Sequence, residues 1–384
     1  MGKKAGKILL ILFAVLDTAV FLFSTGTVFT FIPVIGSAAN IVTVGYLHIW
    51  LPVCAALFLC SVLIAVWDKK KGLWLAVVSF LSLAATAVFL SANAAEVSAY
   101  GVKPNVFLRK VEVSSVKKEE YIYTRSEYGD VGINVYTEED GQTGKPVMIY
   151  IHGGGWIQGS KEDHEYYSKA FAKNGYVVFS AEYDLSSEER HLASSTELQL
   201  CEAFAWVAEH AEKFGGDVSR LYVTGGSAGG NLALNISYKI NSGKYSASAD
   251  GTPLPRVRAV SVTFPVASVA DFYRNGDLVF GKMAYRMAYG YTGCAPEENG
   301  PLYRSLEPEA NIGEDAPATH IMVGAGDALV PPDATYALDE ALEKAGAVHQ
   351  TVVIPYANHI FDTVDGSMLN RAYLDLSLRW FNEH

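Results

Sequence analysis

The sequence predicts an α/β domain, with a mostly parallel sheet covered by helices on both faces, preceded by three transmembrane helices. Two patterns indicate this: strands and helices alternate after about residue 106, and three long apolar stretches fill the first ninety-odd residues. Composition agrees, because 50% of the 384 residues are hydrophobic and 18% are charged, against about 25% charged in ordinary soluble domains. Disordered and disulfide-rich classes are excluded by 12% aromatic residues and four cysteines.

The apolar stretches cover residues 8–35, 41–67 and 73–91. About 20 apolar residues span a bilayer, so residues 1–95 are predicted to form a membrane anchor of three helices. A signal peptide is the competing interpretation of the first stretch, but the apolar run is longer than the apolar core of a signal peptide and no small-residue cleavage site follows it promptly. Asp17 inside it is either functional or simply neutral or hydrogen-bonded to a neighbouring helix.

Lysines predict the orientation of the anchor. Three lysines precede the first span and three more occupy 69–71, whereas the loop at 36–40 is uncharged. Since positive residues stay on the cytoplasmic side, we expect a multi-pass plasma-membrane protein with a cytoplasmic N-terminus and an extracytoplasmic domain at 96–384. In that compartment Cys201 and Cys294 could form a disulfide.

Charge excludes one class of partner. Residues 1–95 carry six lysines and two acidic residues, a net charge of +4, and the whole chain carries −11, which leaves −15 on residues 96–384. A domain of that charge repels phosphate backbones, so nucleic acid is not an expected partner.

The later chain follows the pattern of a parallel sheet. Apolar and β-branched runs predict strands at 111–115, 133–137, 146–151, 176–180, 220–224, 257–264, 320–323 and 350–354. Helical spacing predicts helices at 162–174, 195–214, 228–242, 333–345 and 368–382. Residues 271–312 lack a clear strand, and a stretch of that length is typical of a cap or lid.

The strongest local motif is Gly225-Gly-Ser-Ala-Gly229, between the strand at 220–224 and the helix at 228–242. A G-x-S-x-G sequence there places Ser227 on a sharp turn, with glycines where other side chains would collide. The turn also puts the hydroxyl at a helix N-terminus, which favours developing negative charge. Ser227 is therefore the predicted nucleophile.

A glycine run, His152-Gly-Gly-Gly-Trp156, follows the strand at 146–151. Its bare N–H groups could bind an oxyanion, although alone it could equally be a flexible turn. Paired with a downstream serine turn, the oxyanion interpretation is favoured. His152 precedes the serine, and so it is predicted to brace the loop together with Gly153 and Trp156 rather than to act as the base.

An acid and a histidine follow Ser227 in the expected chain order. Asp327 comes after the strand at 320–323, and His359 comes after the strand at 350–354, where catalytic groups of α/β sheets gather. The less well placed alternatives are His349, Asp333 and His384. Such a triad suits acyl transfer, because the imidazole deprotonates the serine and the carboxylate orients the imidazole.

These motifs together resemble the hormone-sensitive-lipase-like branch of the α/β-hydrolase esterases and lipases. The resemblance implies hydrolysis of carboxylic esters of small acyl groups without a cofactor, with oxyanion amides at Gly154, Gly155 and Ala228. The chain departs from the family pattern at two positions, and both departures weaken any inference of its substrate from the family. Relatives often have an acid where this chain has Gly226, and another shortly after the triad aspartate, where it has Leu329-Val-Pro331.

The leading hypothesis is therefore a membrane-tethered carboxylesterase or acetylesterase acting on small-molecule, lipid or glycan esters. An arylformamidase-like amidase is an alternative, and so is a catalytically silent adhesion or sensing module, which would not need an intact triad. No metal site is predicted, because His164-Glu165 lacks the second histidine of a zinc helix. The oligomeric state is left open.

Overall fold

The computed structural model describes residues 3–28, 39–40, 42–276 and 282–384. The chain divides into two compact units. The first comprises Met1–Lys110, Gly324–Ala328 and Ile354–Ala372, and the second comprises Val111–Val323, Leu329–Val353 and Tyr373–His384. The first unit thus contains, besides the apolar N-terminal region, two short segments from the region predicted to be catalytic.

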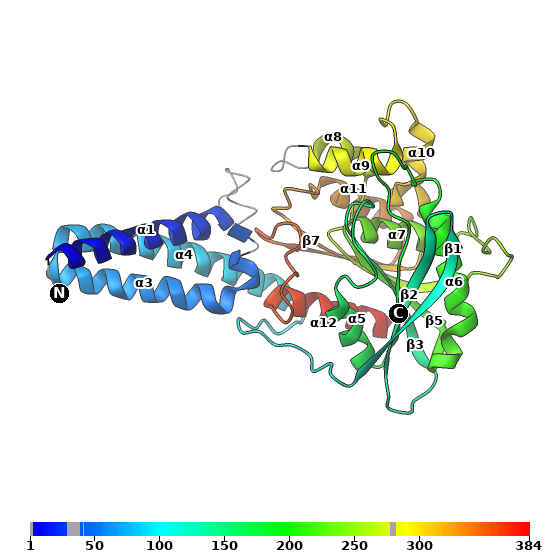
Figure 1. The fold of residues 1–384 in the computed structure, drawn as a ribbon, viewed down its shortest axis with the longest axis horizontal. Helices are drawn as coiled ribbons and strands as arrows, with labels where there is room; N and C mark the ends of the chain where they lie inside the picture. Colours follow the sequence, from blue (N-terminus) through cyan, green and yellow to red (C-terminus); the bar gives the residue numbers. More distant parts are fainter. Residues whose placement is uncertain (1–2, 29–38, 41, 277–281) are drawn as a thin grey trace. The chain divides into compact units, whose positions relative to one another are not determined.

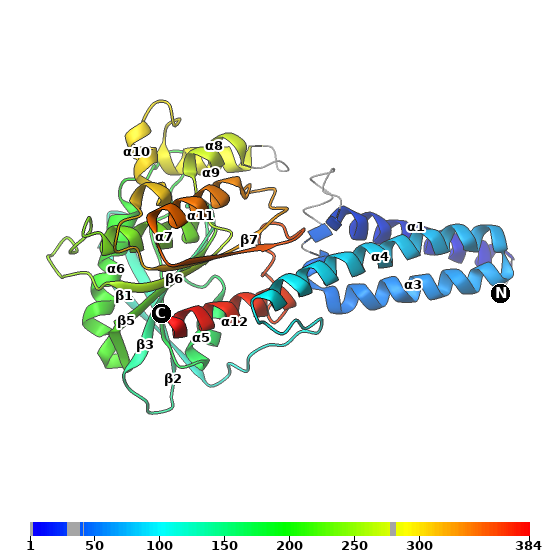
Figure 2. The ribbon, with the colours of Figure 1, turned by 180° about the vertical axis from the view of Figure 1, so that it is seen from behind.

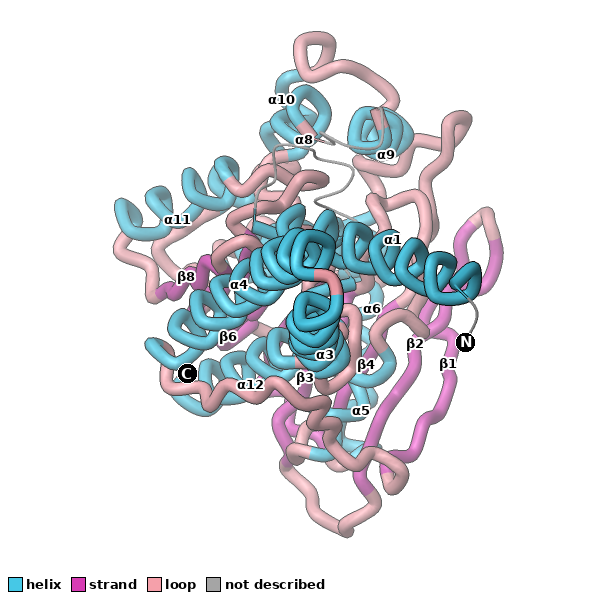
Figure 3. The backbone as a smooth tube through the Cα atoms, turned by 90° about the vertical axis from the view of Figure 1, so that its left-hand side faces the viewer, coloured by secondary structure: helices cyan, strands magenta, loops and turns pink. Residues whose placement is uncertain are grey.

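Three helices of the first unit, α1 (Lys3–Val28), α3 (Leu47–Trp67) and α4 (Lys69–Ala99), lie side by side, and in Figure 3 α1 and α4 cross the view obliquely. All three are long and apolar enough to cross a membrane. The predicted first span reaches beyond Val28 into residues 29–35, which lie outside the described part, as does residue 41. Helix α4 continues past the predicted end at Ser91, because the alanine-rich residues that follow favour helix.

Polar side chains connect the three helices inside this bundle. Fully buried Asp17 accepts a hydrogen bond from Ser79 Oγ at 2.7 Å, and Ser79 also lies 2.9 Å from Ser61. The other links are Trp50 Nε1 to Ser24 Oγ at 2.9 Å, Thr86 Oγ1 to Ser24 Oγ at 3.3 Å, and Thr27 Oγ1 to Thr43 Oγ1 at 2.7 Å. Interhelical hydrogen bonds of this kind stabilise membrane bundles. Asp17 therefore has the structural partner that the simpler interpretation expected.

The second unit is built on an eight-stranded sheet of order β1-β2-β4-β3-β5-β6-β7-β8. The strands are β1 (Val116–Ser126), β2 (Gly129–Glu138), β3 (Lys145–Ile151), β4 (Val177–Ala181), β5 (Gly216–Gly226), β6 (Val257–Thr263), β7 (Ala318–Gly324) and β8 (His349–Ile354). Strands β4, β3, β5, β6 and β7 are parallel neighbours, whereas β2 pairs antiparallel with β1 and β4. The predicted mostly parallel sheet is confirmed.

The predicted strand at 111–115 is wrong, because the first strand begins at Val116. Strand β1 pairs with β2 from Val116 opposite Glu138 to Ser126 opposite Gly129. Its charged run Lys117-Lys-Glu-Glu120 conceals the apolar alternation. Charged side chains are common on edge strands, which expose one side to solvent.

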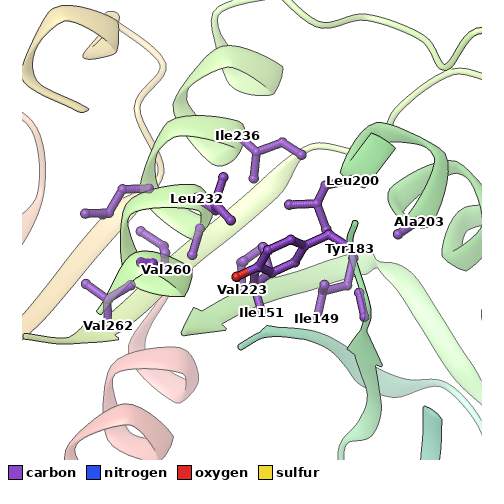
Figure 4. Close-up of a cluster of buried hydrophobic side chains, with 14 of the residues drawn as sticks. Ile149, Ile151, Tyr183, Leu200, Ala203, Val223, Leu232, Ile236, Val260 and Val262 are labelled. Carbon is purple, nitrogen blue, oxygen red and sulfur yellow. The ribbon is translucent and has the colours of Figure 1, made fainter. Parts of the chain in front are cut away.

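Helices cover both faces of the sheet (Figures 1 and 2). One face carries α6 (Thr196–His210) and α7 (Ala228–Asn241), and the other carries α5 (Glu165–Lys173) and the second-unit part of α12 (Met368–Glu383). Figure 4 shows the core beneath α6 and α7, where Leu200 and Leu232 pack over Ile149, Ile151 and Val223. Burying these aliphatic side chains contributes about 1.5–3 kcal/mol each.

The predicted cap consists of helices. It contains α8 (Val269–Asn275), α9 (Met283–Thr292), α10 (Gly300–Ser305) and the 3-10 helix η2 (Pro308–Asn311), and these described parts include no strand. Residues 277–281 of the predicted excursion lie outside the description. Cys201 and Cys294 are both free thiols, so the disulfide considered from the sequence is not formed. Helix α11 (Asp333–Ala345) follows the cap and β7.

Candidate active site

Ser227 occupies the turn between β5 and α7 with φ 55° and ψ −124°. A positive φ is unfavourable for a residue with a side chain and persists only where its surroundings enforce it. Here the Ser227 N–H donates to Thr263 O at 3.0 Å, and the Ser227 carbonyl accepts from Val266 N at 3.2 Å. The strained turn predicted for the nucleophile is therefore present and is held by β6 and the segment after it.

Glycines surround this turn because other backbone segments pass too close for a side chain. A Cβ on Gly225 would lie 2.6 Å from Gly229 O, and one on Gly229 would lie 2.2 Å from Ile151 O. At Gly226 an added Cβ would lie 2.9 Å from Thr263 Oγ1. The acid that relatives often have at this position would thus crowd the Thr263 hydroxyl.

The glycine loop after β3 passes directly against the serine turn. A Cβ on Gly153 would lie 2.8 Å from Gly226 O and 3.4 Å from the Ser227 Cβ. Gly154 has φ 109° and Gly155 has φ 60°. Within the described residues, neither of these two glycine amides donates a hydrogen bond. They can therefore serve an external acceptor, as an oxyanion site requires.

His152 braces this loop. Its Nδ1 lies 2.8 Å from Gly153 O and its Nε2 lies 3.0 Å from Glu182 Oε1, and the buried ring stacks on Tyr183 with centroids 4.2 Å apart. Burial alone would raise the pKa of Glu182, but the hydrogen bond and charge of His152, together with the Lys161 amide, lower it overall. Both imidazole nitrogens have protein partners, so the geometry favours the predicted bracing role over that of a base.

Trp156 joins the same loop to the cap. The side chain is fully buried and stacks on Tyr291 of α9, with centroids 4.5 Å apart and planes 4° apart. Phe272 of α8 meets it edge-on at 6.1 Å. Aromatic pairs of this kind contribute about 0.5–1.5 kcal/mol beyond their buried area. The cap is thereby held against the loop that presents the free amides.

Asp327 and His359 are brought together by the turns that follow β7 and β8. His359 Nδ1 lies 2.6 Å from Asp327 Oδ2, and both side chains are buried. Asn358 joins the two turns, because its Oδ1 accepts from Ala328 N at 3.0 Å and from His359 N at 2.7 Å. The predicted acid–histidine pair therefore exists, while the pairing of His359 with Ser227 stays a prediction.

Sequence reasoning missed Asn358, Glu182 and Met287. Asn358 directly precedes the predicted histidine, and Glu182 directly follows β4, so position relative to strand ends could have identified both. Met287 lies in the cap against the glycine loop, since a Cβ on Gly155 would lie 2.4 Å from its sulfur. No sequence pattern marks that contact.

Comparison with known proteins places the chain among esterases by sequence similarity. Residues 133–342 match the BD-FAE family model. Among curated relatives, Esterase LipQ of Mycobacterium tuberculosis is 26% identical over 235 residues, 60% of this chain and 54% of that protein. Carboxylesterase NlhH of the same species is 36% identical over 150 residues, 38% of this chain and 44% of that protein. The chain spans about half the length of these relatives.

Solved structures confirm the α/β-hydrolase fold. Esterase B from Lactobacillus Rhamnosis superposes with a TM-score of 0.59 at 21% identity, covering 77% of this chain and 92% of that one. A thermophilic esterase from Thermogutta terrifontis, crystallised with butyrate, gives 0.56 at 23% identity, covering 71% and 95%. The sequence resemblance to α/β-hydrolase esterases is therefore confirmed.

Proposed function

Because this chain belongs to the BD-FAE family, we propose that it is a membrane-tethered serine hydrolase that cleaves carboxylic esters of small acyl groups. The observation that carries the proposal is the strained Ser227 turn with the glycine loop against it, since a Gly153 Cβ would lie 3.4 Å from the Ser227 Cβ. The esterase names of the similar proteins support the same reaction class.

In the proposed mechanism the Ser227 hydroxyl attacks the ester carbonyl while His359 accepts its proton. Asp327, 2.6 Å from Nδ1, fixes the imidazole tautomer and stabilises the imidazolium. The amides of Gly154, Gly155 and Ala228 bind the oxyanion, and His359 returns the proton to the departing alcohol. Water then repeats the attack on the acyl-enzyme, giving the carboxylic acid and free Ser227.

The full chain in detergent provides the direct test. We expect it to hydrolyse p-nitrophenyl acetate and butyrate and to react covalently with a fluorophosphonate probe. A folded protein that neither hydrolyses these esters nor binds the probe would refute the proposal and favour a silent adhesion or sensing module. Comparison with formanilide substrates separates ester from amide preference.

Met287 supports the small-acyl assignment, because its side chain fills the space beside Gly155. We expect Met287→Ala to raise kcat/KM for an octanoyl ester relative to an acetyl ester by about tenfold, since removing a pocket wall admits longer chains. Rates on a p-nitrophenyl ester series measure this ratio. Leu302→Ala, in α10 of the cap, should leave it unchanged. An unaltered preference in Met287→Ala would mean that Met287 does not line the acyl site.

Membrane tethering rests on α1, α3 and α4 and on the lysines around them. Each helix is long and apolar enough to span, and the polar groups that connect them lie inside the bundle. The lysines at 69–71 support a cytoplasmic connection between α3 and α4. The proposed arrangement has a cytoplasmic N-terminus and an extracytoplasmic catalytic domain in the plasma membrane, with membrane lipid as its surroundings.

Protease protection tests this orientation. We expect trypsin added to intact spheroplasts to cleave the domain at 96–384, because exposed sites such as Arg125 and Lys344 face the medium. Inverted vesicles should protect that domain while losing an epitope tag placed at the N-terminus. Protection in spheroplasts combined with cleavage in inverted vesicles would reverse the proposed sidedness.

A further inference from the structure

The segment that carries His359 is hydrogen-bonded to the N-terminal helical bundle within the first compact unit. Asn93, in the last turns of α4, is fully buried, and its Nδ2 donates to Pro355 O at 3.0 Å and to Phe89 O at 2.8 Å. One of these bonds stays within α4, and the other reaches the residue directly after β8. The amide of Asn93 therefore fixes the start of the His359 turn to the third helix.

Asn40 binds the same turn at two points. It lies in the connection between α1 and α3 and is 2% exposed. Its Nδ2 donates to Tyr356 O at 2.6 Å, and its Oδ1 accepts from Asn358 N at 2.9 Å. A carboxamide that uses both its donor and its acceptor on one backbone segment sets the orientation of that segment as well as its position.

This turn needs external support because its backbone is strained. Tyr356 has φ 60° and Ile360 has φ 54°, and neither is a glycine. Left-handed backbone is unfavourable for such residues and is retained only where surrounding bonds enforce it. The strained pair encloses His359, and Asn358 between them holds the His359 and Ala328 amides. Support given to Asn358 therefore reaches both members of the acid–histidine pair.

The bundle is built so that all three helices contribute to this support. Thr27 at the end of α1 binds Thr43, just after Asn40, at 2.7 Å. Trp50 of α3 and Thr86 of α4 both bind Ser24 of α1. Helix α4 is about 46 Å long at 1.5 Å per residue, well over the ~30 Å of the hydrocarbon core. Its last turns can therefore carry Asn93 beyond the membrane.

We infer that Asn40 and Asn93 are positioning residues for the catalytic histidine, so that the N-terminal bundle holds the turn that carries it. The inference rests on the proposed function, in which His359 is the base. A simple tether needs one span and no hydrogen bond to the His359 turn. Three spans are required here, because Asn40 comes from the α1–α3 connection and Asn93 from α4.

The test uses the full chain in nanodiscs with the variants Asn40→Ala, Asn93→Ala and their combination. We expect each single variant to lower kcat for a soluble acetyl ester about tenfold and the double variant more, with KM within about twofold, because substrate contacts are unchanged. Hydrogen–deuterium exchange of residues 354–372 should become faster in all three. Ser61→Ala removes a bundle hydrogen bond far along the sequence from Asn40 and Asn93, and it should alter neither readout.

Two outcomes separate the inference from the proposed function. If the wild type is active and the asparagine variants keep its kcat and its exchange rates, the inference is overturned and the proposed function stands. A wild-type chain without turnover or probe labelling overturns the proposed function, and exchange at 354–372 then decides alone whether the bundle braces this turn. Thermal melting of every variant confirms that a slower enzyme is still folded. Restored kcat in Asn93→Gln, which keeps the carboxamide, would further support the hydrogen bond over the volume of the side chain.

Discussion

Ser227→Ala is expected to lower kcat/KM for a short-acyl ester by about 10,000-fold or more, the scale seen when a nucleophile is removed from a serine hydrolase. The proposed reaction passes through an ester on Oγ, and no other group at the turn can replace that oxygen. Alanine keeps the Cβ and the strained backbone with φ 55°. The loss should therefore appear in kcat, while the melting temperature stays near that of the wild type.

The matched control is Ser242→Ala, at the opposite end of helix α7, where Ser242 Oγ donates to Lys239 O, its one hydrogen bond among the described residues. It should retain full activity and fluorophosphonate labelling, whereas Ser227→Ala should lose both. Persistent labelling in Ser227→Ala, at any other residue, would show that the nucleophile has been misassigned even though the family and fold are unchanged.

Asp327→Asn is expected to produce the second largest loss, about 10,000-fold in kcat, as in a serine protease whose triad acid is replaced by its amide. The Asp327 carboxylate accepts from His359 Nδ1 at 2.6 Å, which selects the tautomer that the proposed base requires. An asparagine amide can donate to Nδ1 instead and select the opposite tautomer. His359→Ala should lose at least as much, because it removes the base itself.

The chain provides matched controls for both positions. Asp333 begins α11, and His349 begins β8, at the end of the strand opposite to the one that leads to His359. Asp333→Asn and His349→Ala should keep kcat within about threefold, since neither contacts the proposed reacting atoms. A large loss of kcat in either control, with Asp327→Asn still active, would mean that the alternative residue and not the predicted one is the acid or the base.

The segments that carry the candidate site could be predicted because local sequence and sheet geometry agree on where they lie. A glycine-flanked serine between an apolar strand and a helix is typical of a nucleophile turn. Asp327 and His359 could be identified because each follows a strand, and parallel strands end at one edge of a sheet. The place of His152 before the serine predicts a bracing role, and its bonds to Gly153 O and Glu182 favour that role.

Other features could not be predicted, for physical reasons that differ between them. The edge strand β1 was misplaced because charged residues on its exposed side conceal its alternation. Helix α4 extends eight residues beyond the predicted span, to Ala99, because hydropathy reports where lipid ends and not where a helix does. Asn40 lies 316 positions from its partner Tyr356 in the sequence, and Asn93 lies 262 positions from its partner Pro355. Separations of that size leave no periodic signal in the sequence.

The left-handed backbone at Ser227 and on either side of His359 has a consequence for heat resistance. Each such backbone costs about 1–3 kcal/mol, a substantial fraction of the 5–15 kcal/mol by which a typical domain is stable. Selection for survival at higher temperature would favour substitutions that relax these positions. The same substitutions would lower kcat, because in the proposed mechanism the turns that cost stability also orient the reacting groups. Thermotolerant variants that keep the wild-type kcat should therefore carry their substitutions in the sheet core or on the solvent-facing helices.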